Sequence, residues 1–573
     1  MKTVKLLGVL LILLMSAFVK VSPSDELALI ISEYETPREY GFEKNTSLEN
    51  TNKFFQAEAD FAKRLILKLR GVSDEGLSES EKISKELLLF VLQDKIDRNT
   101  YKMHLNPITN EIAFHLSLGN MGDKTLKNKK GVLEYLRELE ALPAIVDYNL
   151  ELLRAGVKEG VSQPKEAFGN YKITYDKHIV SDVTTSDFYK PFLSLPEALS
   201  IPFKDSILKA AKVSVQKNAI NQYRKIKTFF ETEYFPNTRK GLGVSAIKNG
   251  KAFYQNRINY YTTSTQYTAD DIHEIGLKEV ARIKGEMQKI IDELGFEGSF
   301  ADFLQFLRTD EQFYPKTAKE LLMFARDIAK RIDAELPKYF KTLPRKPYGV
   351  VPVPEAIAPN YTSGRYSGTK EEDKAGFYWV NTYNLPSRTL YTIPALTAHE
   401  AVPGHHLQMS LNNELPDTVP NFRRNLYLSA YGEGWALYTE TLADEMGIYT
   451  TPYEKFGKYT YEMWRACRLV VDTGIHAKGW TRQQVIDYMA ANTALSIHEV
   501  TTETDRYITW PGQAISYKIG EIKIRQLRDK AEKELGDKFN IREFHEIILE
   551  EGTVTLSILE KRVIDYIKKT KNG

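Results

Sequence analysis

The stretch Leu396-Thr397-Ala398-His399-Glu400-Ala401-Val402-Pro403-Gly404-His405-His406-Leu407-Gln408 contains three of the chain's ten histidines within eight residues. A glutamate, Glu400, directly follows the first of them. Neutral imidazole is the commonest metal ligand, and a carboxylate beside it can accept a proton from metal-activated water. The stretch therefore predicts a helical segment that carries a metal site.

The spacing of these histidines differs from that of a regular metal-binding helix. Two ligands usually stand four residues apart, as in His-Glu-x-x-His, because such residues share one helix face. Here His405 follows His399 by six positions, and His406 follows it by seven. On a straight helix, six positions turn the second imidazole by about 120°, and seven move it about 10.5 Å along the axis. Neither pair then fits zinc–nitrogen distances of about 2.0–2.1 Å.

Pro403-Gly404 offers a break in that helix. Proline removes the hydrogen bond back to the His399 carbonyl, and glycine tolerates unusual backbone angles. We therefore predict a local bulge at Val402-Pro403 that brings His405 beside His399. His406 is the alternative second ligand, and the histidine that is not a ligand could orient one that is.

A third ligand is needed, because open catalytic zinc sites commonly use two histidines and one carboxylate and leave a position for water. The best candidate is Glu433, in the run Tyr431-Gly432-Glu433-Gly434-Trp435-Ala436-Leu437-Tyr438, 28 residues after His405. The flanking glycines would allow a close approach of another helix. The predicted ligands are thus His399, His405 and Glu433, holding one Zn²⁺ per chain.

Several motifs resemble those of the bacterial domain-of-unknown-function 885 family, over most of the chain after about Asn237. Besides the histidine run, they are Asn381-Thr382-Tyr383, Glu433-Gly434-Trp435-Ala436, Arg468-Leu469-Val470-Val471-Asp472-Thr473-Gly474-Ile475-His476, Pro511-Gly512-Gln513-Ala514 and Tyr517. The resemblance implies a zinc metallopeptidase, distantly similar to carboxypeptidase Taq and angiotensin-converting enzyme, which carry His-Glu-x-Gly-His. Reading Val402-Pro403 as a two-residue insertion aligns Gly404-His405 with their Gly-His. The implied fold is mainly α-helical and two-lobed, with a deep central cleft and a small antiparallel sheet near the metal helix.

Three residues outside the ligand set are predicted to have catalytic roles, the first two by analogy with the metallopeptidases that this chain resembles. Glu400 would act as general base and then as proton donor to the leaving amine. Tyr517 follows the metal residues in the order of the catalytic tyrosine of angiotensin-converting enzyme. His476 would donate to the reaction intermediate or bind a substrate carboxylate. Tyr517 and His476 also have structural alternatives, as a buried aromatic ring and a packing histidine.

Three further residues are predicted to bind substrate. Arg506, in a predicted loop, could grip a peptide C-terminus through two hydrogen bonds, and an ion pair with Glu503 is the alternative. Tyr378 and Asn381 lie in the strand-like run 375–382. In the metallopeptidases that this chain resembles, an edge strand there pairs with extended peptide. An interior strand of a small sheet is the alternative.

Composition limits the classes of partner. The chain has 573 residues, 42% of them hydrophobic, which is ample for a large core. Its 78 basic and 76 acidic side chains nearly balance, so no nucleic-acid or membrane-surface partner is expected. The single cysteine, Cys467, excludes an intrachain disulfide and is predicted to be a buried packing residue.

The N-terminus is typical of a signal peptide, predicted over residues 1–22. Lys2 and Lys5 precede an apolar run from Leu6 to Val19, which is short for a membrane span. No cysteine lies nearby, which argues against a lipid anchor. We therefore expect an exported protein, periplasmic or secreted, without stable membrane association after removal of the signal; an uncleaved anchor is the alternative.

The remaining chain is predicted to form two regions, divided where Pro236-Asn237-Thr238-Arg239-Lys240-Gly241 interrupts the helical pattern. Residues 23–236 would form an N-terminal helical region that lines one wall of the cleft. Residues 237–573 would form the catalytic region. Capping boxes at Ser78/Glu81 and Thr481/Gln484 predict helix starts. The run 101–118 is predicted to be a hairpin and 252–261 a strand.

The function predicted from these features is zinc-dependent hydrolysis of peptide bonds in short peptides, with a glutamate as general base. Carboxypeptidase, dipeptidase and oligopeptidase activities all remain open. The alternatives are a non-catalytic peptide-binding protein that retains the cleft, and a zinc-dependent amidase or esterase acting on other substrates.

Overall fold

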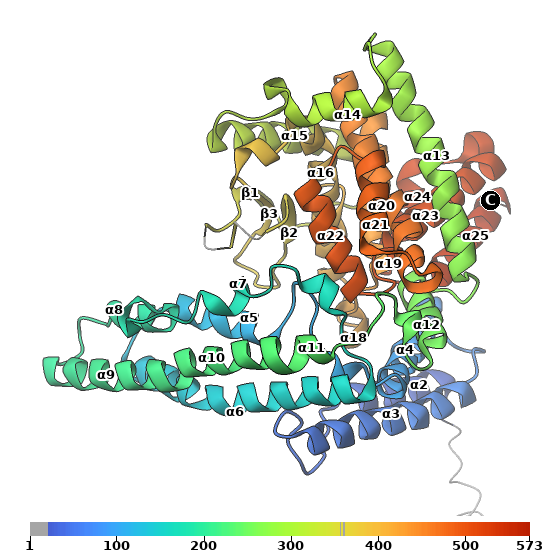
Figure 1. Ribbon diagram of the computed structural model, residues 1–573. Helices are drawn as coiled ribbons and strands as arrows, with labels where there is room; N and C mark the ends of the chain where they lie inside the picture. Colours follow the sequence, from blue (N-terminus) through green and yellow to red (C-terminus); the bar gives the residue numbers. More distant parts are fainter. Residues whose placement is uncertain (1–20, 356, 359–360, 573) are drawn as a thin grey trace, which may run out of the picture.

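Helices form nearly all of the structure, a computed structural model that describes residues 21–355, 357–358 and 361–572 (Figure 1). The predicted signal peptide lies almost entirely outside these residues. Among the helices that are described, none combines the length and the apolar character needed to cross a membrane. The mainly helical fold predicted from the sequence is confirmed.

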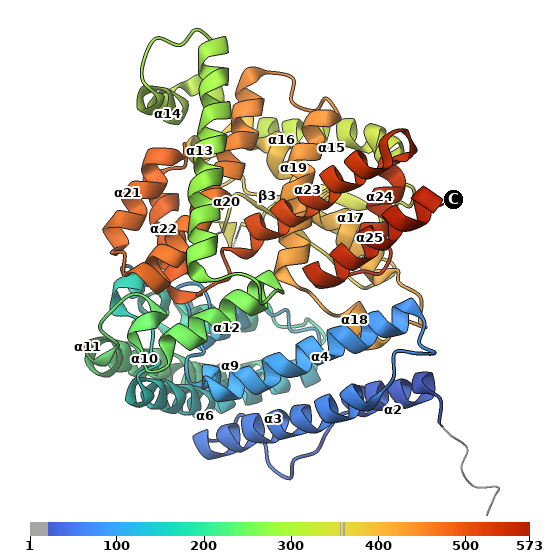
Figure 2. The same ribbon diagram turned by 90° about the vertical axis from the view of Figure 1, so that its right-hand side faces the viewer.

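Residues 21–240 form the lower layer in Figures 1 and 2, where long helices run across the molecule beneath the later ones. Two π-helical stretches, Val215–Ile220 and Phe229–Tyr234, join α9, α10 and α11 into one continuous rod. The helices of this layer are α2 (Pro23–Glu35), α3 (Leu48–Gly71), α4 (Glu79–Thr100), α5 (Phe114–Gly119), α6 (Lys129–Glu159), α7 (Ile173–Asp176), α8 (Lys190–Leu193), α9 (Ile201–Ser214), α10 (Asn221–Thr228) and α11 (Phe235–Asn237).

The upper layer surrounds a short central helix, α16, which ends in the predicted metal-binding stretch. Helix α16 packs against α15, α19 and α20, and α20 packs along α13. The helices of this layer are α12 (Gly250–Thr262), α13 (Ala269–Glu293), α14 (Phe300–Thr309), α15 (Ala318–Tyr339), α16 (Ile393–Glu400), α17 (His405–Asn413), α18 (Asn421–Arg424), α19 (Ser429–Glu445), α20 (Pro452–Lys478), α21 (Arg482–Asn492), α22 (Ile497–Thr509), α23 (Ser516–Leu535), α24 (Ile541–Leu549) and α25 (Leu556–Asn572).

A three-stranded sheet lies beside α16, and its order is β1-β3-β2. The strands are β1 (Tyr348–Pro352), β2 (Gly364–Ser367) and β3 (Gly376–Val380). Strand β1 runs parallel to β3, while β2 runs antiparallel to it. The sheet is therefore mixed, which corrects the predicted antiparallel sheet. The predicted strand at 375–382 is present, but β3 is the central strand, so the edge position predicted for it is wrong and the interior alternative is right.

Two local predictions in the first half of the chain are also wrong. Residues 101–118 form a 3₁₀ turn and α5 rather than a hairpin. Residues 252–261 lie in α12, which buries Tyr254, Ile258 and Thr262 at intervals of four. The capping boxes at the starts of α4 and α21 are present as predicted.

The two layers share one hydrophobic core. A single cluster of buried side chains includes Leu139 and Tyr223 from the lower layer and Ile283, Leu469 and Ile524 from the upper layer. It therefore extends across the predicted boundary near residue 236. Cys467 is fully buried within it, as predicted.

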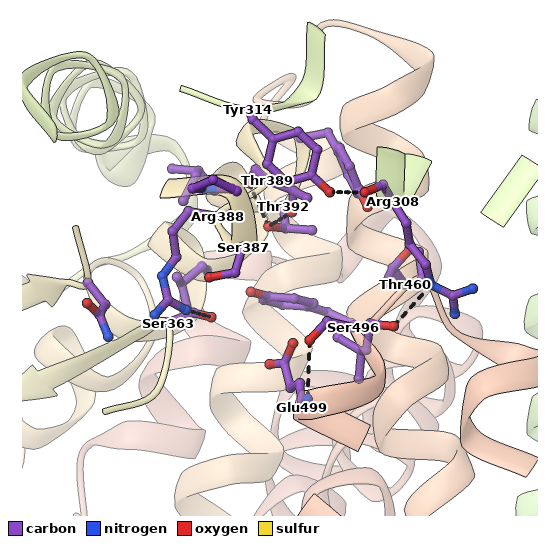
Figure 3. Close-up of a pocket in the computed structure, with 18 of the residues that line it drawn as sticks. Arg308, Tyr314, Ser363, Ser387, Arg388, Thr389, Thr392, Thr460, Ser496 and Glu499 are labelled. Atoms are coloured by element: carbon purple, nitrogen blue, oxygen red, sulfur yellow. Dashed lines mark hydrogen bonds between the residues drawn. The ribbon is translucent and has the colours of Figure 1, made fainter. Parts of the chain in front are cut away.

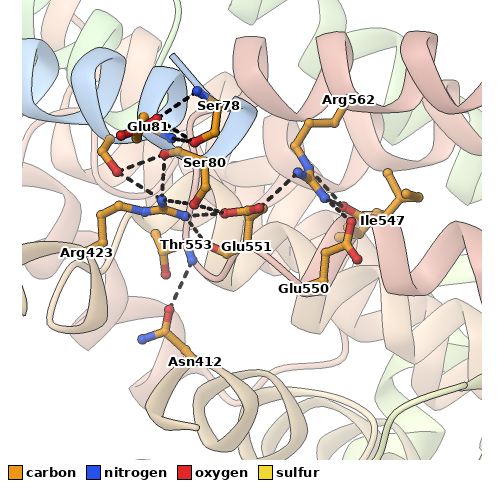
Figure 4. A network of polar contacts seen from close by, with 12 residues as sticks. Ser78, Ser80, Glu81, Asn412, Arg423, Ile547, Glu550, Glu551, Thr553 and Arg562 are labelled. Atoms are coloured by element: carbon orange, nitrogen blue, oxygen red, sulfur yellow. Dashed lines mark hydrogen bonds and ion pairs between the residues drawn. The ribbon is translucent and has the colours of Figure 1, made fainter. Parts of the chain in front are cut away.

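A buried arginine adds a polar junction between the layers (Figure 4). Arg423 of α18 is only 1% exposed, and its Nη1 donates to the carbonyl of Ser80 at 3.0 Å and to the Ser84 hydroxyl at 3.1 Å, both on α4. Its Nη2 donates to the Glu551 carboxylate at 2.6 Å, in the connection between α24 and α25. One guanidinium thus joins three distant segments of the chain.

Candidate metal centre

The helix that carries His399 ends at Glu400, and the next helix begins at His405. A four-residue turn with a cis Val402–Pro403 peptide separates them. Gly404 makes the turn possible, because a Cβ atom there would lie 1.9 Å from the carbonyl oxygen of His399. The break predicted at Pro403-Gly404 is therefore present, and it is tight enough to exclude any side chain at position 404.

This turn brings His405 back beside His399. Their ring centroids are 4.8 Å apart, and the Nε2 atoms of both rings face the carboxylate of Glu433 on α19. The Oε2 atom of Glu433 lies 3.5 Å from Nε2 of His399 and 3.3 Å from Nε2 of His405. Two donors about 2.0–2.1 Å from a tetrahedral zinc ion stand about 3.3–3.4 Å apart. The donor types and their spacing thus fit a zinc site with two histidines and one carboxylate.

Helix α19 is fixed against the turn by specific contacts. The indole N–H of Trp435 donates to the carbonyl of Pro403 at 2.9 Å. Gly434 lies directly on the backbone of Gly520 in α23, where an added Cβ would come within 2.6 Å. The close helix approach predicted from the glycines beside Glu433 is therefore present, and it sets the position of the third donor.

A second carboxylate, missed by the sequence analysis, orients His399. Glu440 is 1% exposed, and its Oε1 lies 2.8 Å from Nδ1 of His399 and 3.5 Å from Nη2 of Arg465. A hydrogen bond from Nδ1–H to this carboxylate leaves Nε2 free to act as a ligand. The available signal was the spacing, since Glu440 follows Glu433 by seven residues and therefore lies two turns along the same helix face.

The electrostatics of the cluster favour a cation. Burial alone would lower the pKa of His399, but hydrogen bonding to Glu433 and Glu440 raises it to about 10. Burial would likewise raise the pKa of Glu433, but His405 and His399 hold it well below its ordinary value. The carboxylates therefore stabilise positive charge at this point, whether on an imidazole or on a bound ion.

Glu400 lies beside the cluster and next to the edge of the sheet. Its Oε2 accepts a hydrogen bond of 2.8 Å from the backbone N–H of Tyr366 in β2. The neighbouring Arg365 faces the same site: desolvation works against its charge, but Tyr361, Glu400 and Glu433 together raise its pKa. Arg365 was also missed, because a lone arginine in a short strand carries no sequence signal.

His406 points away from the cluster. Its Nδ1 lies 3.1 Å from the Tyr366 hydroxyl and 3.3 Å from the Ser410 hydroxyl, and its ring packs against Tyr348. Between the two histidines that the sequence left open, His405 is the one placed with His399 and Glu433.

Tyr517 and Arg506 lie in contact with each other. Arg506 is on α22 rather than in the predicted loop, and its Nη2 lies 3.3 Å from the Tyr517 hydroxyl and 2.7 Å from Oε1 of Gln513. It also forms the ion pair with Glu503 that was the alternative, at 3.3 Å. The ring of Tyr517 stacks on the guanidinium of Arg468, with the cation 4.5 Å from the ring centroid. The hydroxyl of Tyr517 thus accepts from a cation and keeps its own proton for donation.

Three predicted site residues have structural roles instead. His476 is fully buried, accepts from the N–H of Val244 at 3.1 Å and donates to the carbonyl of Tyr507 at 2.9 Å, so neither ring nitrogen is available to substrate. Tyr378 is fully buried in the central strand. Asn381 is also buried, and its amide donates to the carbonyls of Ala358, Tyr361 and Thr362. The catalytic role of His476 and the substrate contacts of Tyr378 and Asn381 are therefore corrected.

Comparisons with known proteins agree on the fold and name no activity. A crystal structure described as a putative lipoprotein from Colwellia psychrerythraea is similar over 96% of this chain and 100% of its own, with a TM-score of 0.84 and 25% identity. A putative lipoprotein of unknown function from Shewanella oneidensis shares the fold over 94% of this chain and 97% of its own, with a TM-score of 0.68 and 19% identity. A search of the curated proteins finds no match. The model of the family described as bacterial protein of unknown function (DUF885) matches residues 37–563, so this chain belongs to that family.

Proposed function

We propose that this chain is a zinc metallopeptidase that hydrolyses short peptides outside the cytoplasm. The observation that carries the proposal is the convergence of His399, His405 and Glu433 at separations of 3.3 and 3.5 Å, with Glu400 next to them. A Zn²⁺ ion bound there supplies polarisation of the scissile carbonyl and a more acidic water at neutral pH.

The chain's own residues supply the remaining chemistry. Glu400 keeps one oxygen on the Tyr366 N–H, so its other oxygen takes a proton from water and passes it to the leaving amine. Tyr517 donates its hydroxyl proton toward the developing oxyanion, with Arg506 holding the phenol oxygen. Arg365 adds a second positive group on the side of the edge strand.

The substrate class follows from the edge strand beside Glu400. Strand β2 is at the edge of the sheet, and an extended peptide that pairs with it would present its backbone to Glu400. His399 and His405 are buried, which would limit access to short, flexible chains. Export is part of the proposal, supported by the predicted signal over residues 1–22 and by the lipoprotein descriptions of the two similar structures.

The test is to measure zinc content and peptide cleavage together. The purified protein is expected to bind about one zinc per chain and to cleave members of a mixed peptide library, followed by mass spectrometry. A chelator is expected to abolish cleavage and zinc to restore it. Glu400→Gln is expected to keep the metal and lose at least about a hundredfold in activity, since general acid–base catalysis contributes about 10²–10⁴-fold.

Three results would contradict the proposal. Full activity of the Glu400→Gln protein would remove the proposed proton transfer. Zinc binding with hydrolysis of ester or amide probes and of no peptide would assign a different hydrolase. Peptide binding that is unaffected by chelation, with no cleavage, would identify a non-catalytic binding protein.

A further inference from the structure

A cavity of about 250 Å³ lies against the first part of α16 (Figure 3). Its lining includes Thr392, which precedes α16, Leu396 of α16, Tyr461 of α20 and Glu499 of α22. Pockets that hold drug-sized ligands measure about 300–1,000 Å³. This cavity is therefore of a size for one amino-acid side chain.

The cavity and the metal centre share two structural elements. Leu396 precedes His399 by three residues, so its side chain lies about one helical turn from the first ligand. The Leu396 side chain also lies against β2, because a Cβ atom built at Gly364 would come within 3.0 Å of its Cδ2. Two residues further along β2, Tyr366 holds Glu400. A peptide lying along β2 would thus place a side chain at the cavity while its backbone is at Glu400.

Two oppositely charged side chains border the cavity without contacting each other. Glu499 makes no side-chain hydrogen bond or ion pair with any residue that the structure describes. Arg388 donates to the Tyr383 carbonyl at 3.1 Å and to the Ser363 hydroxyl at 3.2 Å, and within the described part of the chain it pairs with no carboxylate. Both side chains border the same cavity (Figure 3).

The neighbouring charges are already paired, which isolates these two. Arg465 lies 3.5 Å from Glu440, and Arg468 lies 3.1 Å from Glu503. A second arginine of the cavity, Arg308, is held by the carbonyls of Leu495 and Ala490 at 3.1 Å each. A ligand in the cavity therefore meets Glu499, whose carboxyl group has no side-chain partner among the described residues, and Arg388, whose Nη2 makes no hydrogen bond within the described part of the chain.

We propose that this cavity is a side-chain subsite that takes the carboxamide of a glutamine or asparagine residue next to the scissile bond. The amide oxygen accepts from Arg388 and the amide nitrogen donates to Glu499. The placement next to a scissile bond rests on the proposed peptidase function, whereas the amide selectivity rests on the cavity alone.

The two oppositely charged side chains of the cavity favour an amide ligand over a charged one. A lysine or arginine would face Arg388, and an acidic side chain would face Glu499. Burial, with Glu503 adding to it, raises the pKa of Glu499 to about 7, so its carboxyl group gives only partial counter-charge to a cation near neutral pH. An amide satisfies both groups in either protonation state of Glu499, and a buried polar group that is left without a partner is costly.

The experiment measures binding to the Glu400→Gln protein, which keeps the site but does not consume the peptide. Isothermal titration compares Ala-Xaa-Ala and Ala-Ala-Xaa peptides in which Xaa is Gln, Met, Lys or Glu, because methionine matches glutamine in size without its polar groups. We expect the glutamine peptide of one series to bind at least about tenfold more tightly than its methionine partner, as a site built for hydrogen bonds rejects an analogue that lacks them.

Two second-site variants and one control locate the effect. Glu499→Leu and Arg388→Met are each expected to reduce the glutamine-over-methionine ratio to less than about threefold, with folding checked by thermal unfolding. His498→Gln, on the exposed side of the same helix, is expected to leave the ratio unchanged.

The outcomes separate this proposal from the function proposed above. Equal binding of glutamine and methionine peptides, or a preference for lysine or glutamate, overturns the amide subsite even if the wild-type protein hydrolyses peptides. A glutamine preference that survives Glu499→Leu and Arg388→Met also overturns it. Selective glutamine binding that both variants remove supports the subsite, even if no peptide is ever cleaved.

Discussion

Replacing Gly404 with alanine is expected to disrupt the metal centre while most of the fold persists. The added Cβ would lie 1.9 Å from the His399 carbonyl oxygen and 2.5 Å from that of Ala398. Both are backbone atoms of α16, so neither can rotate away. Ordinary contact begins near 3.4 Å, which requires the turn to open by about 1.5 Å.

That displacement is large compared with the tolerance of a metal site, where ligand distances hold to about ±0.2 Å. His405 would leave the position shared with His399 and Glu433. Structural zinc sites with four ligands bind with about 10–16 kcal/mol, so one lost ligand corresponds to about 3 kcal/mol. The zinc dissociation constant is therefore expected to rise about a hundredfold. Overpacking is expected to lower the free energy of unfolding by about 1–3 kcal/mol.

Competition with a chromophoric chelator would measure zinc affinity, and urea unfolding would measure stability. Gly285→Ala is the matched control, because Gly285 lies in the middle of α13 and an added Cβ there would meet no atom within 4 Å. That variant is expected to keep zinc affinity and to be slightly more stable, by about 0.5–1 kcal/mol. Gly404→Ala protein that binds zinc as tightly as the wild type would refute the geometric argument for the turn.

Three further predictions concern other parts of the structure. Glu440→Gln is expected to weaken zinc binding about 10–100-fold in chelator competition, because the His399 ring loses its charged partner. Glu445→Gln on the same helix is the control and is expected to keep the zinc affinity. Equal affinities of the two variants would show that the Glu440 carboxylate does not tune the site. Arg423→Ala is expected to lower the free energy of unfolding by about 1–3 kcal/mol in urea titrations, because it removes the buried guanidinium that binds the Ser80 carbonyl, the Ser84 hydroxyl and the Glu551 carboxylate. The neighbouring Arg424 forms an exposed ion pair, so Arg424→Ala is expected to lower the free energy of unfolding by at most about 1 kcal/mol. Similar losses of stability in the two variants would contradict this reasoning. Burial raises the pKa of Asp472 to about 7, above an unfolded value of about 3.9, so its contribution to stability is full at low pH and lost as pH rises through about 7. Asp472→Asn is expected to make the fall in unfolding free energy between about pH 4 and about pH 8 less steep, by up to the slope that one bound proton contributes. An unchanged slope would assign that fall to other groups.

Helix starts were predictable because their signals are local. The reciprocal bonds of Ser78 with Glu81 and of Thr481 with Gln484 involve residues three apart, and both boxes form as expected. The run 252–261 was wrongly predicted as a strand because its aromatic residues have high strand propensity. The competing signal was the interval of four between Tyr254, Ile258 and Thr262, which marks a buried helix face.

The donor set of the candidate metal centre was predictable to the level of residue type. Two histidines, a carboxylate and a proline-glycine break are all visible in the sequence. The direction of each side chain depends on the turn, and for that reason the choice between His405 and His406 needed coordinates. The polar residues His476 and Asn381 were misassigned for a related reason. A sequence shows that a side chain can form hydrogen bonds, but not that distant backbone groups already occupy them.

The bond from the Trp435 indole to the Pro403 carbonyl has a mechanical consequence. It links α19, which carries Glu433, to the turn that joins the helices of His399 and His405, so one connected set of contacts holds the three donors. If the surrounding helices move to admit a peptide or release its fragments, the space around a bound ion would widen while the distances among the three donors stay constant. Substrate access and metal affinity would then be independent properties of the same chain.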